Sequence, residues 1–220
     1  MPGASFIFDL DGTLVDSLPG IEASIRAAVE KCLPGRPVPP IRDHIGPPIR
    51  LMLERLYPDR NSFQMDFLVS AFREHYDTRG CRESRLYPGV LEVLGELRAA
   101  DCALFVLTNK PFAASLAILE ETGIRSHFAD VVSPDSIDPP FSNKTDGARF
   151  LKERFRLEPA LTFLIGDGLD DAAAAEACGF AFFFASYGYG SALTTRTPAP
   201  VAVLQSFGEI PFHFAENTFL

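Results

Sequence analysis

Two aspartates follow the first apolar run of the chain, in the stretch FDLDGTL at positions 8–14. Side chains alternate between the two faces of a strand, so Asp9 and Asp11 would point the same way if the strand continued through them. Gly12 lets the backbone turn sharply and approach a ligand. We therefore expect two carboxylates at the carboxyl end of a strand, the edge where ligands bind in open α/β sheets. The alternative is a β-hairpin with Asp11 and Gly12 as its turn, because Asp-Gly is a favoured turn pair.

A second acidic group occurs in GDGLDD at positions 166–171, after an apolar run and before an alanine-rich segment. Capping of the following helix and attraction to its dipole account for Asp170 or Asp171. They do not account for Asp167, which comes directly after the apolar run and beside a glycine. A carboxylate in that place fits a hard divalent cation, since magnesium sites combine one or two carboxylates with substrate phosphate and water.

Two further signals are a polar turn and a lysine. The segment TNK at positions 108–110 follows the apolar run that ends at Leu107. A hydroxyl and an amide between a strand and a helix can bind an anion together with free backbone N–H groups, although plain N-capping by Thr108 or Asn109 is the alternative. Lys144 precedes the helical segment that leads to the next apolar run, and taken alone it is a solvated surface charge.

Short apolar runs separated by helical segments must position these groups. A strand, helix, strand alternation predicts right-handed crossovers and a parallel sheet covered by helices on both faces, so the fold class is α/β and Rossmann-like. The predicted strands are Ser5–Phe8, Cys102–Leu107, Asp130–Val132, Leu161–Ile165 and Phe180–Ala185.

A helical insert interrupts this alternation between the first and second strands. A crossover needs about a dozen residues, whereas the segment from Ser17 to Arg85 is far longer and has apolar residues at helical spacing throughout. Prolines between positions 34 and 48 separate its first helix from the next, because proline and the residue before it resist helical geometry. We expect residues 1–16 and 86–220 to form the core domain and residues 17–85 a small helical cap domain.

Composition excludes several classes of protein. The chain has 20 Lys and Arg against 29 Asp and Glu, a net charge of −9, which argues against a nucleic-acid partner. No apolar stretch approaches the ~18 residues of a membrane span, and the N-terminal residues lack the features of a signal peptide. Four widely spaced cysteines indicate reduced thiols in a cytoplasmic protein rather than a disulfide scaffold. These are Cys32, Cys81, Cys102 and Cys178.

Taken together, the order of the signals resembles that of a known family. The chain is similar to the phosphohydrolases of the haloacid dehalogenase superfamily, in particular the phosphoglycolate-phosphatase-like branch. The resemblance covers the chain from Phe6 to about Ser191. The motifs that carry it are DLDGTL (9–14), TNK (108–110), Lys144 and GDxxxD (166–171), supported by VDS (15–17), YPGV (87–90) and YGYGS (187–191).

The resemblance implies a reaction through an aspartyl-phosphate. Asp9 would be the nucleophile, and Asp11 would be general acid and then general base. Mg²⁺ would be held by Asp9, by the backbone carbonyl of Asp11 and by Asp167, while Asp171 orders its water ligands. Asp170 is the rival of Asp171 for that role.

The resemblance also implies the groups that bind the phosphate. Thr108 and Lys144 would bind the transferring phosphoryl oxygens, helped by backbone N–H groups near Gly12 and Asn109. Lys144 would in addition offset the charge of the acids and so counts as catalytic. Its rivals for this role are Lys110 and Lys152.

The expected substrate is a small phosphorylated metabolite, with phosphoglycolate the first choice and a 5′-nucleotide or another sugar or acid phosphate next. The insert would close over the site and exclude water. Its Arg42, His44 and Arg50 could present positive charge to an acidic substrate; the alternative is an ordinary exposed loop. A phosphomutase and a catalytically silent binding protein are further alternatives, and dehalogenation is disfavoured because it needs no second acid. We expect a monomer or homodimer.

Overall fold

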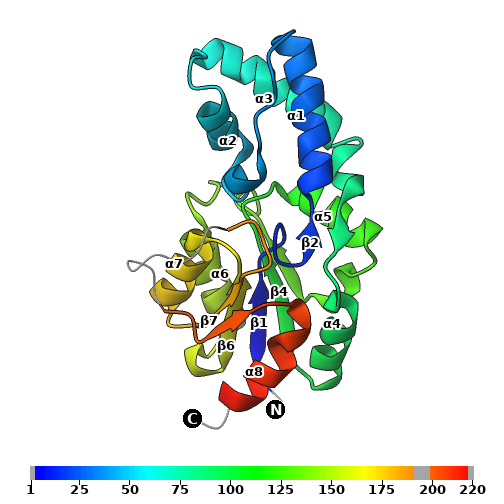
Figure 1. Cartoon of the computed structure of the whole chain (residues 1–220). Coiled ribbons are helices and arrows are strands. Elements are labelled where there is room, and N and C mark those ends of the chain that lie inside the picture. The colour runs from blue at the N-terminus through cyan, green and yellow to red at the C-terminus, as the bar shows by residue number, and fades with distance from the viewer. Residues whose placement is uncertain (1–2, 191–198, 218–220) are drawn as a thin grey trace.

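The computed structural model describes residues 3–190 and 199–217, so Ser191 of the YGYGS motif lies outside the described residues. Within that part of the chain, six parallel strands form one sheet in the order β5-β4-β1-β6-β7-β8 (Figure 1). The α/β prediction is confirmed, and each of the five predicted strands is present within one residue of its expected bounds. The strands are β1 (Ser5–Phe8), β4 (Ala103–Leu107), β5 (Asp130–Val132), β6 (Thr162–Gly166), β7 (Ala181–Ala185) and β8 (Ala202–Leu204).

Strand β1 lies at the centre of the sheet. It pairs in parallel with β4 on one side and with β6 on the other, so that Phe6 is opposite both Leu104 and Phe163. Because the three strands run the same way, their carboxyl ends reach one edge of the sheet together. The loops that follow β1, β4 and β6 therefore converge.

Both faces of the sheet are covered, because alternate side chains of each buried strand enter different hydrophobic clusters. Phe6 and Phe8 belong to one cluster and Ile7 to the other. The first cluster includes residues of α4, α5 and α8, while α6 and α7 pack together on the opposite face (Figure 1). These helices are α4 (Val90–Ala99), α5 (Phe112–Glu121), α6 (Lys144–Phe155), α7 (Leu169–Cys178) and α8 (Ile210–Asn217).

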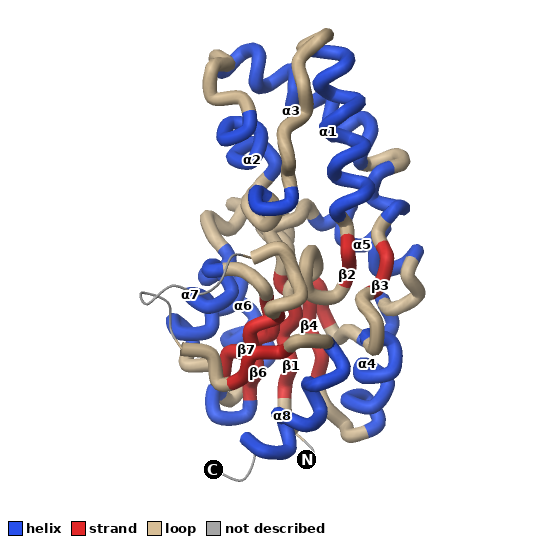
Figure 2. Tube along the Cα trace, in the orientation of Figure 1, coloured by secondary structure: helices blue, strands red, loops and turns tan. Residues whose placement is uncertain are grey.

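The segment of residues 17–84, which we call the helical insert, leaves and rejoins the body through two short antiparallel strands. Strands β2 (Val15–Asp16) and β3 (Arg85–Leu86), which the sequence patterns did not predict, pair with each other and lie between the sheet and the helices of the insert (Figure 2). The insert contains α1 (Leu18–Cys32), α2 (Ile49–Leu56) and α3 (Ser62–Tyr76), and it stands beyond the carboxyl edge of the sheet.

Helix α3 begins with a capping box, in which Asn61 and Gln64 each accept a hydrogen bond from the other's backbone N–H. Its buried stripe contains Met65, Leu68, Val69, Phe72 and Tyr76. Phe63 and Phe67 lie outside this stripe, 69% and 56% exposed, and their rings pack edge to face. Both are apolar residues of α3, but their positions in the helical repeat lie on the face that points away from the core.

The C-terminal helix packs on the sheet through the rings of Phe214 and His213, the latter against Phe183. The ring of Phe214 packs edge-on against Phe6 and Phe163, while Phe212 is exposed. Among the described residues, no helix is both long enough and apolar enough to span a bilayer.

Candidate active site

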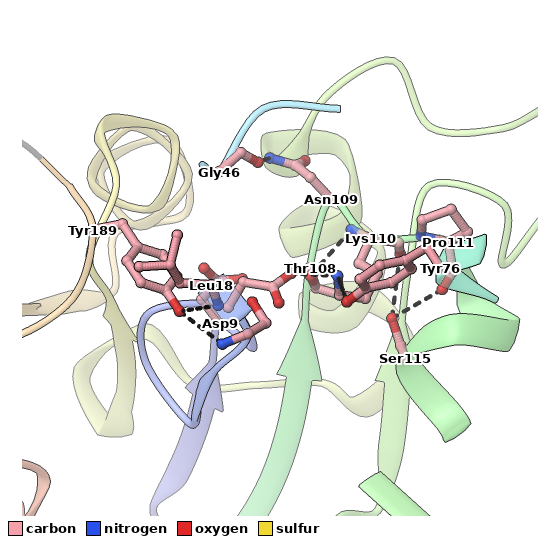
Figure 3. A network of polar contacts seen from close by, with 12 residues as sticks. Asp9, Leu18, Gly46, Tyr76, Thr108, Asn109, Lys110, Pro111, Ser115 and Tyr189 are labelled. Atoms are coloured by element: carbon pink, nitrogen blue, oxygen red, sulfur yellow. Dashed lines mark hydrogen bonds and ion pairs between the residues drawn. The ribbon is translucent and has the colours of Figure 1, made fainter. Parts of the chain in front are cut away.

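The side chains that follow the three central strands lie at one edge of the sheet. Asp9 follows β1, Thr108 follows β4 after Leu107, and Asp167 follows β6. All three are buried, and Figure 3 shows Asp9 and Thr108 above the ends of their strands. Parallel pairing of β4, β1 and β6 is the physical reason for this convergence.

The loop after β1 is a tight turn and not the turn of a hairpin. The carbonyl of Leu10 accepts the backbone N–H groups of Leu14 and Val15. Strand β2 then pairs with β3 and not with β1, so the hairpin alternative is wrong. Gly12 has φ +82°, and a Cβ atom there would lie 2.2 Å from Asp167 Oδ2. Only glycine allows this close approach of the first loop to the carboxylate of the third.

Lys144 is the first residue of α6, whose N-terminus is capped by Asn143. Its Nζ lies 2.8 Å from Asp9 Oδ1 and 2.7 Å from Asp171 Oδ1, and its side chain is only 2% exposed. The loop lysine is thus a buried ion-pair partner and not a solvated surface charge. Its rival Lys152 donates to the carbonyl of Cys178 and lies outside this cluster.

Asp9, Asp167 and Asp171 form a cluster of buried carboxylates in which one oxygen of each lies within 4.8 Å of the others. Asp171 also accepts the backbone N–H of Gly168 and thereby caps α7 from inside the helix. Asp170 is 41% exposed and lies outside the cluster, where its Oδ2 accepts the Asn109 amide at 2.6 Å. The capping considered for this pair therefore belongs to Asp171, which also lies in the carboxylate cluster.

The cluster carries more negative charge than its one lysine balances. Burial raises the pKa of Asp9 to about 7, although Lys144 acts against this shift. Burial also raises the pKa of Asp167 and of Asp171. Burial opposes the charged form of Lys144 too, but the neighbouring aspartates raise its pKa well above its ordinary value. A buried, purely oxygen donor set with surplus negative charge fits a hard divalent cation such as Mg²⁺.

Asp11 lies in a second buried ion pair. Its Oδ2 is 3.0 Å from Nζ of Lys110, which donates to the hydroxyl of Tyr76 at 2.8 Å (Figure 3). The other oxygen of Asp11, Oδ1, is buried with no hydrogen-bond partner among the described residues. From the sequence, Lys110 is expected only as part of the TNK motif and as a rival of Lys144. Nothing in the sequence indicates a role for Tyr76 of the insert.

The polar turn after β4 does not cap α5. That helix begins at Phe112 with Pro111 at its N-cap, so the capping alternative for Thr108 and Asn109 is wrong. Thr108 Oγ1 instead accepts the backbone N–H of Lys110 at 3.1 Å. The Asn109 amide donates to the carbonyl of Gly46 in the insert (Figure 3). It also donates to Asp170.

Tyr189 connects the site to the start of the insert. Its backbone N–H donates to Asp167 Oδ2 at 2.6 Å, and its hydroxyl donates to Asp16 Oδ1, also at 2.6 Å. The same hydroxyl accepts the backbone N–H groups of Ser17 and Leu18. The YGYG motif was recognised in the sequence, but nothing there indicates a role for the Tyr189 hydroxyl, since its partners lie more than 170 positions away.

A cavity of about 610 Å³ opens beside Asp11, between the core and the insert. None of the three basic residues considered for substrate contact lines it. Arg42 donates to the carbonyl of Gly188 and packs on the Tyr189 ring, and Arg50 pairs with Asp66 and Glu54. Lining residues include Asn109 and Lys110 of the core and Met52, Phe72, Arg73 and Tyr76 of the insert.

The model of the haloacid dehalogenase-like hydrolase family matches residues 4–179. The chain belongs to that family. The expected resemblance is therefore confirmed, and so is the expected class of enzyme, a hydrolase of phosphoric monoesters. The matched range includes the three segments that follow β1, β4 and β6 and meet at one edge of the sheet.

The chain is also similar to individual proteins with different named activities. A phosphoglycolate phosphatase of Chromobacterium violaceum is 32% identical over 200 residues, covering 85% of this chain and 86% of the relative. The tyrosine-protein kinase PtkA of Mycobacterium bovis is 34% identical over 197 residues, covering 87% of this chain and 66% of the kinase. The crystal structure of a predicted phosphoglycolate phosphatase from Haemophilus somnus superposes with a TM-score of 0.84 at 27% identity, covering 96% of this chain and 97% of that one.

Proposed function

We propose that this hydrolase is a Mg²⁺-dependent phosphatase that acts through an aspartyl-phosphate on Asp9. The observation that carries the proposal is the buried cluster of Asp9, Asp167 and Asp171 beside Lys144. A phosphate monoester is an anion and resists an anionic nucleophile unless cations offset the charge of both. One lysine and one divalent ion would supply that charge here.

Asp9, Asp167 and the backbone carbonyl of Asp11 would hold the ion, and Asp171 would order its water ligands. When bound, Mg²⁺ offsets the charge that accumulates between nucleophile and phosphate. Lys144 holds one oxygen of Asp9 by its ion pair at 2.8 Å and fixes the direction of the carboxylate.

In the first step the substrate phosphorus forms a bond to a carboxylate oxygen of Asp9 while the bond to the leaving oxygen breaks. Asp11 gives its proton to that leaving oxygen. Its Oδ1 is suited to this role because it is buried and has no hydrogen-bond partner among the described residues. Thr108 and backbone N–H groups near Gly12 and Asn109 would bind the transferring oxygens, although the N–H of Gly12 itself donates to the carbonyl of Val15.

In the second step water attacks the phosphorus and gives a proton to Asp11. The bond between phosphorus and Asp9 breaks, which releases inorganic phosphate and restores both carboxyl groups. General acid and base catalysis of this kind contributes about 10² to 10⁴ in rate.

The proposal includes a domain division in which residues 1–16 and 86–220 form the core and residues 17–85 a cap. The cavity beside Asp11, bounded by both parts, would then take the leaving group and exclude water from it. Phosphoglycolate is the first substrate to test, because relatives about 30% identical to this chain are named phosphoglycolate phosphatases. A cytoplasmic location belongs to the same proposal, since all four cysteines are free thiols.

Hydrolysis of p-nitrophenyl phosphate tests the reaction. We expect turnover with Mg²⁺, loss of turnover with a chelator, and no turnover by Asp9→Asn at any Mg²⁺ concentration. The matched control is Asp66→Asn, an exposed aspartate of the insert that pairs with Arg50 and does not line the cavity, and we expect it to keep its activity. Unchanged turnover by Asp9→Asn would refute the mechanism.

A phosphotransferase is the second candidate, favoured by the 34% identity to a tyrosine-protein kinase. An acceptor hydroxyl would then replace water: its oxygen forms the new bond to phosphorus, the bond between phosphorus and Asp9 breaks, and its proton passes to Asp11. Comparing inorganic phosphate release with the yield of phosphorylated acceptor separates the two reactions.

A further inference from the structure

Lys110 is the buried cation of this site that the proposed mechanism leaves without a role. It follows Thr108 and Asn109 at the end of β4, and its side chain is 8% exposed. Burying an ammonium group is costly unless it is paired and hydrogen-bonded. The burial of Lys110 therefore depends on what surrounds it.

Two groups from different parts of the chain surround Lys110. Asp11 Oδ2, from the loop after β1, lies 3.0 Å from Nζ. The hydroxyl of Tyr76, at the end of α3 in the helical insert, accepts a hydrogen bond from Nζ at 2.8 Å, and Nζ also lies 4.6 Å from the centre of the Tyr76 ring. The ammonium group thus bridges the core and the insert.

The pairing is one-sided at Asp11. One carboxylate oxygen contacts Lys110, whereas the other is buried and has no hydrogen-bond partner among the described residues. Asp11 and Lys110 also both line the cavity. A carboxyl held by one oxygen has its rotation restricted, which leaves the second oxygen facing a fixed direction.

We propose that Lys110 is a positioning residue that holds the Asp11 carboxyl toward the leaving oxygen. Tyr76 holds Lys110 in turn, so the position of Asp11 depends on the packing of the insert against the core. This inference rests on the proposed function, because it assigns Asp11 the proton that passes to the leaving oxygen as the bond to phosphorus breaks. Lys110 takes no part in the bonds that form or break.

The test compares two esters that need the proton to different degrees. An alkoxide such as that of phosphoglycolate leaves only with a proton, whereas p-nitrophenolate is a stable anion and leaves without one. The ratio of kcat/KM for the two esters therefore reports how well Asp11 delivers its proton. Loss of packing, or of phosphate binding, lowers both values equally and does not change the ratio.

We expect Lys110→Met to lower kcat/KM for phosphoglycolate about 10²-fold, the scale of a misplaced catalytic group, and to lower that for p-nitrophenyl phosphate far less. Lys110→Arg restores part of the ratio. In an Asp11→Asn background, Lys110→Met has no further effect on the ratio, since both substitutions act through the same carboxyl. Lys152→Met, outside the cluster, is the matched control and leaves the ratio unchanged.

Tyr76→Phe keeps the ring and removes only the hydroxyl, so it serves if Lys110→Met fails to fold. We expect Tyr76→Phe to shift the ratio in the same direction as Lys110→Met but by less. Tyr57 of the insert donates to the carbonyl of Pro37, and Tyr57→Phe is the control that leaves the ratio unchanged. Two results would overturn the inference without touching the proposed phosphatase function. One is an equal loss of kcat/KM for both esters, and the other is a ratio that Lys110→Met still shifts in the Asp11→Asn background. If the unaltered protein hydrolyses neither ester, the proposed function fails, and the inference with it.

Discussion

The hydroxyl of Tyr189 lies 2.6 Å from Asp16 Oδ1. This hydrogen bond connects the loop after β7 to the last residue of β2, directly before the helical insert begins. The backbone N–H of the same tyrosine binds Asp167. A single residue therefore contacts both a carboxylate of the cluster and the base of the insert, which fixes their relative positions.

We expect Tyr189→Phe to destabilise the protein by about 1–3 kcal/mol, because it removes the three hydrogen bonds that the hydroxyl makes with Asp16 and with the backbone N–H groups of Ser17 and Leu18. Urea unfolding measures the change. Tyr187→Phe removes one hydrogen bond, to the carbonyl of Thr13, and is the control with the smaller loss. A Tyr189→Phe variant as stable as the parent would show that these contacts do not hold the insert.

Gly12→Ala and Gly35→Ala form a matched pair. Both glycines have φ near +82°, so each substitution brings the strain of a left-handed residue, about 1–2 kcal/mol. Only at Gly12 does the new Cβ meet Asp167. We expect Gly35→Ala to keep its kcat and Gly12→Ala to lose about 10²-fold or more, the cost of a displaced carboxylate. Equal kcat values for the two variants would show that the close approach is irrelevant to catalysis.

Asp171→Asn and Asp170→Asn separate the two rivals at the start of α7. Asp171 is buried in the cluster, and we expect its loss to weaken Mg²⁺ binding about 10- to 100-fold, as for other groups that orient metal ligands. Asp170 is 41% exposed and 3.8 Å from Lys144, so we expect a change of no more than about fivefold. Titration calorimetry with Mg²⁺ gives both affinities, and the reverse order would assign the role to Asp170.

The metal-free protein should lose stability as the pH rises from about 4 to about 7. The folded-state pKa of Asp9 is about 7 against an ordinary value of 3.8, so the folded chain retains a proton that the unfolded chain releases. Its contribution is fully present below pH 3.8 and is lost as the pH rises through about 7. Mg²⁺ replaces the proton, so its stabilising effect grows over the same interval. Thermal unfolding with and without Mg²⁺ checks this, and an effect of Mg²⁺ independent of pH would contradict it.

Much of the fold and the order of the site could be predicted because apolar runs mark buried strands. Once β1, β4 and β6 are adjacent and parallel, the residues that follow them meet, and this brings Asp9, Thr108 and Asp167 to one edge. Sequence spacing alone did not decide which of Asp170 and Asp171 lies in the carboxylate cluster. Only the rotation of α7 buries one and exposes the other.

Contacts between the core and the insert could not be predicted in the same way. Tyr76 lies in a helical pattern that accounts for its burial, and no local signal reveals that its hydroxyl meets Lys110. The position of Arg42 on the Tyr189 ring likewise depends on how two separate units dock. Short strands such as β2 and β3 have too few residues for an alternating pattern.

Direct detection of phosphate on Asp9 tests the central claim. The protein is mixed with Mg²⁺ and substrate, quenched in acid within one turnover, digested, and its peptides are weighed by mass spectrometry. We predict that the peptide containing residues 8–14 gains the mass of one phosphoryl group, that fragmentation places it on Asp9, and that Asp9→Asn shows none. A phosphate-free Asp9 peptide throughout a time course in which substrate is consumed would contradict the account.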